Sequence, residues 1–142
     1  MPKPKPGNTQ SSRKQSSSKP KLGSQTETLT ATFFEKNGHT VLARNWRSGR
    51  LGELDLVVWD PDSKTLIFVE VKARSNEEKG PAIAAITPQK QAQLLMLAEQ
   101  FLANSQDPLP PFQTLRFDVV TWDYRGQTQR WQMQHWPDAF QS

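Results

Sequence analysis

Two β-rich runs joined by a short turn constrain the fold of this chain more than any other feature. Residues 54–59 and 66–73 are rich in Leu, Val, Ile and Phe, and each has the usual length of a strand. Residues 60–64 lie between them and read Asp-Pro-Asp-Ser-Lys, in which Pro and Asp favour turns. The pattern predicts an antiparallel hairpin.

One face of each strand of this hairpin mixes charged and apolar side chains, and its charges lie only at the end far from the turn. Alternation assigns one face to Glu53, Asp55, Val57 and Trp59 on the first strand and to Phe68, Glu70, Lys72 and Arg74 on the second, with Leu54, Leu56 and Val58 on the opposite face. A pairing symmetric about the turn places Asp55 roughly opposite Glu70. Like charges repel there unless a cation lies between them, and carboxylate oxygens suit Mg²⁺ or Mn²⁺.

Lys72 follows Glu70 one alternation later on the same face. An ammonium group there could orient an attacking water or stabilise charge that develops on a phosphate. Two acids, a divalent metal and a lysine are the components that metal-assisted phosphodiester hydrolysis requires. A charged face is also typical of the solvated side of a half-covered sheet, so the residues alone leave both interpretations open.

The remainder of the chain predicts a single α/β domain. The expected elements are, in order, a helix over 26–38, a strand over 41–46, the hairpin, a helix over 87–103, and strands over 115–122 and 128–136. Thr26 and Thr87 are suited to cap the two helices, and Pro88 fits the first helical position. The order αβββαββ favours one mixed central β-sheet flanked by helices.

The first 24 residues differ in composition from the rest. They hold six Lys and Arg, no acid, and repeated Pro and Ser, which predicts a disordered basic tail over 1–24 before a domain over 25–142. The chain has a net charge of +4, yet without the tail it carries 12 basic and 14 acidic side chains. A basic arm is suited to sequence-independent attraction to nucleic-acid phosphates; a solubilising leader is the alternative.

Missing residue types and patterns exclude several classes of protein. The chain has no Cys, which excludes disulfides, thiolate catalysis and Cys-based zinc sites. No apolar run approaches the ~20 residues of a membrane span, and the N-terminus lacks the apolar core of a secretory signal. We therefore expect a cytoplasmic protein without a membrane partner.

Five short segments have the order and spacing typical of one family. They are Leu42-Ala-Arg-Asn-Trp-Arg47, Gly52-Glu-Leu-Asp-Leu56, Phe68-Val-Glu-Val-Lys-Ala-Arg74, Thr87-Pro-Gln-Lys-Gln91 and Arg116-Phe-Asp-Val-Val120. Together they resemble the bacterial YraN-like family, uncharacterised protein family UPF0102. That family is similar to the restriction-endonuclease-like PD-(D/E)xK nuclease superfamily, particularly to archaeal Holliday-junction resolvases. The resemblance covers residues 22–140 and implies a restriction-endonuclease-like fold.

The resemblance also implies a set of site residues. Asp55 and Glu70 would be the metal-binding acids, and Lys72 the catalytic lysine. Glu27 would be the first-helix acid that completes the site, and Gln91 a site residue at the start of the second helix.

Two positions depart from the pattern of the family. Thr26 stands where the family usually has the glycine that precedes the first-helix acid. Leu54 stands where the superfamily name expects proline, a variation that leaves Asp55 in place.

Five basic residues are candidates for phosphate contacts: Arg44, Arg47, Arg50, Arg74 and Lys90. The expected function is metal-dependent cleavage of nucleic acid, with DNA considered first and branched DNA among the candidates. The alternatives are a non-catalytic nucleic-acid-binding protein of nuclease fold and an assembly or interaction factor. A homodimer is expected if both strands of a junction are cut, because two-fold symmetry presents two identical sites.

Overall fold

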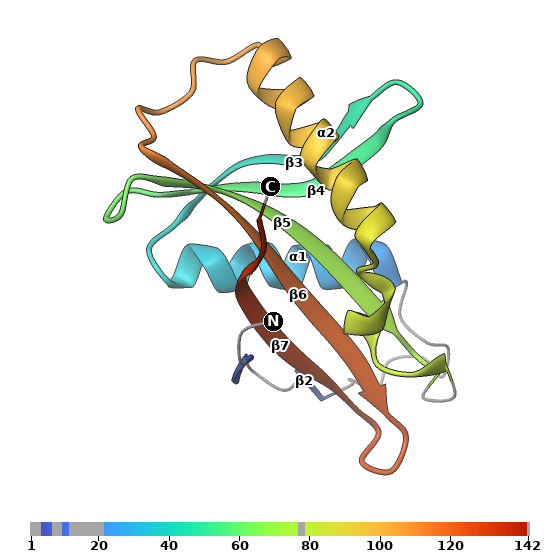
Figure 1. Ribbon diagram of the computed structural model, residues 1–142. Coiled ribbons are helices and arrows are strands. Elements are labelled where there is room, and N and C mark those ends of the chain that lie inside the picture. The colour runs from blue at the N-terminus through green and yellow to red at the C-terminus, as the bar shows by residue number, and fades with distance from the viewer. Residues whose placement is uncertain (1–3, 7–9, 12–21, 77–78, 142) are drawn as a thin grey trace.

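A mixed β-sheet runs through the molecule, with one long helix on each face (Figure 1). The computed structural model describes residues 4–6, 10–11, 22–76 and 79–141, and the structural statements below concern these residues. The long elements are α1 (Leu22–Lys36), β3 (Thr40–Ser48), β4 (Gly52–Asp60), β5 (Thr65–Arg74), α2 (Pro88–Asn104), β6 (Thr114–Arg125) and β7 (Arg130–Phe140). Two-residue strands β1 (Lys5–Pro6) and β2 (Gln10–Ser11) and the short 3₁₀ helix η2 (Ala82–Ala85) complete the set. The predicted order αβββαββ is confirmed.

The strand order explains how segments distant in sequence come together. The strands lie in the order β1-β7-β6-β5-β4-β3, and β2 also pairs with β7. β5 and β6 are parallel, whereas the other neighbouring strands are antiparallel. A parallel pair cannot be joined by a tight turn, so the chain crosses over through η2 and α2. This crossover brings the first turn of α2 to β5, where Lys90 lies beside Glu70.

Two apolar clusters, one on each face of the sheet, form the core. The α2-side cluster contains Leu54, Val57, Leu66, Phe68, Ile86, Leu94, Leu97, Ala98, Phe101, Phe117, Val119 and Phe140. The α1-side cluster contains Ala31, Phe34, Leu56, Val58, Ile67, Val69, Val120, Trp122, Trp131 and Met133. Neighbouring residues of β5 therefore pack on opposite faces. Burial of both faces explains why the central strands are apolar over continuous runs.

Helix α1 begins at Leu22, four residues before the predicted cap. Thr26 therefore does not cap the helix: it is buried, and its carbonyl accepts a hydrogen bond from Thr30 Oγ1 at 2.7 Å. Thr30 Oγ1 also accepts a hydrogen bond from Trp122 Nε1 of β6 at 3.0 Å. These contacts with the sheet extend the helix beyond what its local sequence indicates.

The structure describes part of the N-terminal segment over 1–24, for which the sequence predicts disorder. Residues 5–6 and 10–11 pair with β7, and Leu22 and its next two residues belong to α1. The other residues of that segment, except residue 4, lie outside the part of the chain that the structure describes.

Helix α2 begins as the sequence predicted. The hydroxyl of Thr87 accepts a hydrogen bond from the Lys90 backbone N–H at 3.2 Å, and Pro88 occupies the first turn. The cap fixes where the helix starts and so which side chains of its first turn face β5. In the described part of the chain, neither helix has both the length and the apolar character of a membrane span.

Candidate active site

The pairing between β4 and β5 ends before the two strands do. Its last pair is Leu56 with Val69, so Asp55 and Glu70 are the next residues on the two strands. Asp55 Oδ2 accepts a hydrogen bond from the Val71 backbone N–H at 2.8 Å, in place of a backbone carbonyl. The two acids are therefore neighbours, as the symmetric hairpin predicted, and they lie where the strands separate.

Glu70 is nearly buried, and two lysines lie near it. Its Oε2 lies 3.3 Å from Nζ of Lys90, and its Oε1 is buried without a hydrogen-bond partner among the described residues. Burial raises the pKa of Glu70, although the charges of Lys90 and Lys72 act in the opposite direction. An unpartnered carboxylate oxygen in a dry position is costly, so a further cation or donor would stabilise the site.

Glu27 of α1 is a third acid in contact with Asp55. Burial, followed by the charge of Asp55, raises the pKa of Glu27 to about 7. Burial, followed by the charge of Glu70, raises the pKa of Asp55 to about 8, against the opposing hydrogen bond from Val71. Near neutral pH these carboxyls therefore keep protons that ordinary carboxyls release. A divalent cation could take the place of those protons.

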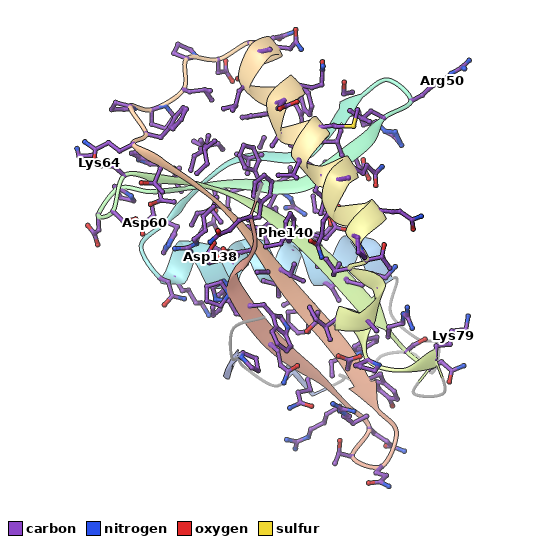
Figure 2. The ribbon with its side chains drawn as sticks, in the orientation of Figure 1. Arg50, Asp60, Lys64, Lys79, Asp138 and Phe140 are labelled. Carbon is purple, nitrogen blue, oxygen red and sulfur yellow. The ribbon has the colours of Figure 1, made fainter. Side chains whose placement is uncertain are left out.

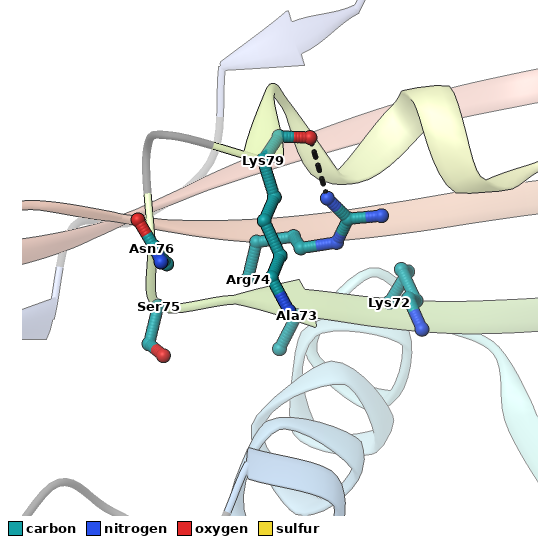
Figure 3. Close-up of a pocket in the computed structure, with 6 residues that line it drawn as sticks. All are labelled: Lys72, Ala73, Arg74, Ser75, Asn76 and Lys79. Carbon is teal, nitrogen blue, oxygen red and sulfur yellow. Dashed lines mark hydrogen bonds between the residues drawn. The ribbon is translucent and has the colours of Figure 1, made fainter.

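A cavity of about 380 Å³ opens beside Lys72 at the end of β5 (Figure 3). Its lining residues are Lys72, Ala73, Arg74, Ser75, Asn76 and Lys79. Arg74 Nη1 donates a hydrogen bond to the Lys79 carbonyl at 2.8 Å, which holds the guanidinium at the cavity. With Lys72, Arg74 and Lys79 around it, the cavity is suited to an anionic group.

Two residues of the first turn of α2 make contacts within the protein that the sequence did not predict. Gln91 Nε2 donates to the Ile86 carbonyl at 3.2 Å, so its amide nitrogen closes the turn before the helix. Lys90, which the sequence assigned to phosphate contact, is paired with Glu70. The sequence could not show which of Lys90 and Gln91 faces Glu70, because that depends on how α2 packs against β5.

Three of the predicted phosphate contacts lie around the β3–β4 hairpin, away from the cavity. Arg44 Nη2 donates to Thr28 Oγ1 of α1 at 3.0 Å. Arg47 is exposed and its Nε lies 3.6 Å from Glu53 Oε2. Arg50 extends from the turn of the hairpin (Figure 2). These side chains lie along β3 and the turn that joins it to β4.

The alternation of β4 breaks at Asp55. Leu54 packs in the α2-side cluster together with Val57, whereas Leu56 packs in the α1-side cluster. The predicted grouping of Leu54 with Leu56 is therefore wrong. The residue of β3 opposite this break is Asn45, whose φ is 51°. Sequence reasoning did not single out Asn45, although Asn within an otherwise regular strand is a signal of such a conformation.

A second buried polar cluster lies apart from these acids, between β6 and β7. Asp118 accepts two hydrogen bonds from Arg116, at 2.8 and 3.0 Å, and lies 2.8 Å from His135 Nε2. The Asp138 backbone N–H donates to Asp118 at 2.9 Å. Although burial opposes it, the hydrogen bonds from His135 and Arg116 lower the pKa of Asp118. The contacts with His135 and Asp138 tie β6 to β7, and those with Arg116 lie within β6, which together indicate a structural role.

Two carboxylates are available for a metal ion at the candidate site. Within the described residues, no group of three or more His, Asp and Glu side chains is arranged to hold one. Mg²⁺ is often held by one or two carboxylates, with water and substrate phosphate completing its shell. The oxygen donors of Asp55 and Glu70, and the unpartnered Glu70 Oε1, fit an ion bound in that way.

These features define an α/β domain with a buried carboxylate–lysine site where two strands of a mixed sheet separate. The chain belongs to the family described as Uncharacterised protein family UPF0102, whose model matches residues 26–122. Family membership, which the five segments predicted, is thereby confirmed.

Relatives in this family match most of the chain. A UPF0102 protein of Geobacter metallireducens is 40% identical over 120 residues, which are 84% of this chain and 92% of that protein. One from Pelotomaculum thermopropionicum is 41% identical over 121 residues, 84% of this chain and 94% of that protein. One from Bifidobacterium longum is 41% identical over 100 residues, 70% and 78% of the respective chains.

Proposed function

We propose that this protein is a metal-dependent nuclease that hydrolyses phosphodiester bonds in nucleic acid. The observation that carries the proposal is the convergence of Glu27, Asp55 and Glu70 beside Lys72, next to the cation-lined cavity. Two buried acids with a half-buried third beside them oppose folding unless they are neutralised. Such a cluster next to a basic wall fits a site that takes up a cation together with a polyanion.

Asp55 and Glu70 would hold Mg²⁺ or Mn²⁺ through their carboxylate oxygens, Glu70 Oε1 among them. When bound, the ion supplies a Lewis acid for a phosphate oxygen and lowers the pKa of water. Glu27 contacts Asp55 from α1, so it helps fix the direction of the Asp55 carboxyl. The protons that burial retains on these groups would leave as the ion binds.

Lys72 would act on the phosphate itself. It follows Glu70 by one alternation on β5, its charge acts on Glu70, and it also lines the cavity, so it is placed near both the acids and any phosphate held there. Positive charge at that place stabilises the negative charge that develops on phosphate oxygens in the transition state. Lys90, whose side chain is 33% exposed, could move from Glu70 to a phosphate once another cation neutralises Glu70.

Nucleic acid is the proposed substrate class because the basic groups form a path rather than a single contact. Lys72, Arg74 and Lys79 continue from the acids along the cavity, and the six positive charges of residues 1–24 add a further basic segment. Contacts between basic side chains and phosphates supply most of the sequence-independent affinity of proteins for nucleic acid. The resemblance to Holliday-junction resolvases makes branched DNA the first substrate to test.

The test is a cleavage assay with the full-length protein on linear, flapped and four-way DNA and on single-stranded RNA, with Mg²⁺ or Mn²⁺. We expect cleavage that EDTA and Glu70→Gln abolish. Asp62→Asn, which removes an exposed acid of the β4–β5 turn, should leave the rate unchanged. Binding without cleavage under all these conditions would favour a non-catalytic nucleic-acid-binding protein. Neither binding nor cleavage would favour an assembly or interaction factor.

A further inference from the structure

Asn45 has a backbone conformation that strands normally avoid. Its φ is 51°, in the middle of β3. Its neighbours Arg44 and Trp46 pair with Leu56 and Leu54, so Asn45 lies opposite Asp55. Isolated left-handed residues are mainly Gly, with Asn and Asp the next most tolerant. Such a conformation persists only where the surrounding structure holds it, and it is common at functional sites.

The strand opposite Asn45 changes direction at the same place. Leu54 and Val57 pack in one cluster although three positions separate them, which regular alternation would place on opposite faces. The reversal lies at Asp55, whose carboxyl reaches the Val71 N–H in the gap between β4 and β5. A local irregularity in one strand re-aims side chains in this way. The left-handed residue and the redirected acid therefore face each other across the two strands.

The side chain of Asn45 lies next to the third acid. Burial and the charge of Asp55 raise the pKa of Glu27, and the neighbouring amide of Asn45 acts in the opposite direction. An amide can donate to a carboxylate without adding charge. Lys or Arg in its place would compete with a metal ion, and Asp would add a fourth acid. Asn thus combines tolerance of the left-handed backbone with an uncharged donor.

We propose that Asn45 is a positioning residue of the candidate site. Its left-handed backbone directs Asp55 into the gap between β4 and β5, and its amide holds Glu27 against Asp55. The inference rests on the proposed function in that these are the acids of the proposed metal site. It also gives a role to Asn45 within residues 42–47, a segment in which the sequence assigned chemistry only to Arg44 and Arg47.

The backbone part of the inference is tested without metal, by hydrogen exchange of the Val71 amide in full-length protein with EDTA. Gly adopts the left-handed conformation freely, whereas Ala does not, so N45G should keep the protection of the Val71 amide. N45A should accelerate exchange about tenfold relative to the other slow amides of β5. Gln129→Ala is the matched control, since Gln129 has a φ of 56° in the β6–β7 turn. It should leave Val71 unchanged.

Equal Val71 protection in N45A and wild type would overturn the backbone part. Should N45A fail to fold, N45S is measured in its place, with the same expected direction. A change of the same size in Gln129→Ala would also overturn it, because the effect would then reflect general loss of stability.

The side-chain part is tested by Mn²⁺ calorimetry on N45G, E27Q and the double variant. Losing the amide contact should weaken Mn²⁺ binding about 3- to 10-fold in N45G, the effect of one hydrogen bond. The same change should have no effect on the E27Q background, since the amide acts through Glu27. Wild-type affinity in N45G, or equal losses in both backgrounds, would overturn this part.

A metal-free readout separates this inference from the proposed function. The ¹³C shift of the Glu27 carboxyl in EDTA should change in N45G and stay unchanged in Gln129→Ala. If wild-type protein takes up no Mn²⁺, the proposed metal site fails while this shift still decides whether Asn45 holds Glu27. An unchanged shift in N45G would overturn the side-chain role.

Discussion

Replacing Asp55 with Asn should stabilise the metal-free protein, and the gain should grow with pH. Burial and the charge of Glu70 raise the pKa of Asp55 from 3.8 to about 8. Between these values the folded chain retains a proton that the unfolded chain has released, so the free energy of unfolding falls by about 1.4 kcal/mol per pH unit as pH rises. This loss of stability begins as pH rises past the pKa of Asp55 in the unfolded chain and is complete above its pKa in the folded chain.

The size of the effect follows from the same shift. About four pH units correspond to about 5.5 kcal/mol as an upper bound. Water entering the gap would reduce this value, so we expect a gain of about 2–5 kcal/mol near pH 9. Asn can still accept the hydrogen bond from the Val71 N–H, since its side chain keeps a carbonyl oxygen. Well below pH 3.8 the two proteins should be equally stable, because Asp55 is then protonated in both the folded and the unfolded state.

Urea unfolding in EDTA at several pH values measures this difference directly. Asp62→Asn is the control for removal of an exposed carboxylate, and it should follow the pH dependence of the wild type. Parallel curves for wild type and Asp55→Asn would refute the reasoning, because Asp55 would then not be held in a dry, acid-rich gap. A variant that is less stable at every pH would refute it as well.

Three further predictions concern the neighbouring cations and the N-terminal segment. Lys90→Gln should strengthen Mn²⁺ binding at least about 3-fold, as measured by calorimetry. The substitution removes an ammonium group that lies 3.3 Å from Glu70 Oε2 and competes with the metal. Weaker binding would contradict this prediction. Lys72→Ala should abolish turnover while changing DNA affinity by less than the ~1–3 kcal/mol of a strong specific contact, as single-turnover kinetics and anisotropy would show. A chain that begins at Leu22 lacks the six basic residues of the N-terminal segment. The slope of log K against log salt concentration for duplex DNA should therefore be smaller by about two to four, where six phosphate contacts would account for about five. An unchanged slope would mean that the removed residues do not contact DNA.

Much of the fold could be predicted because its signals are local. The hairpin of β4 and β5 follows from turn-forming residues between two apolar runs, and the register then follows from Asp60 pairing with Thr65. The start of α2 follows from Thr87 and Pro88, whose effects act within one helical turn. The start of α1 could not be predicted, because burial of Thr30 beneath Trp122 depends on a strand 92 residues later in the chain.

The sequence by itself determined that Asp55 and Glu70 are neighbours with Lys72 beside them. A short turn and a two-residue alternation leave little freedom over so few residues. Only the tertiary structure decided which way Asp55 points, since that direction depends on the left-handed backbone of Asn45 in a different strand. It likewise decided that Lys90, rather than Gln91, meets Glu70. These contacts join segments separated by 10 to 20 residues or more, and their geometry is set by how helices and strands pack, which no local pattern encodes.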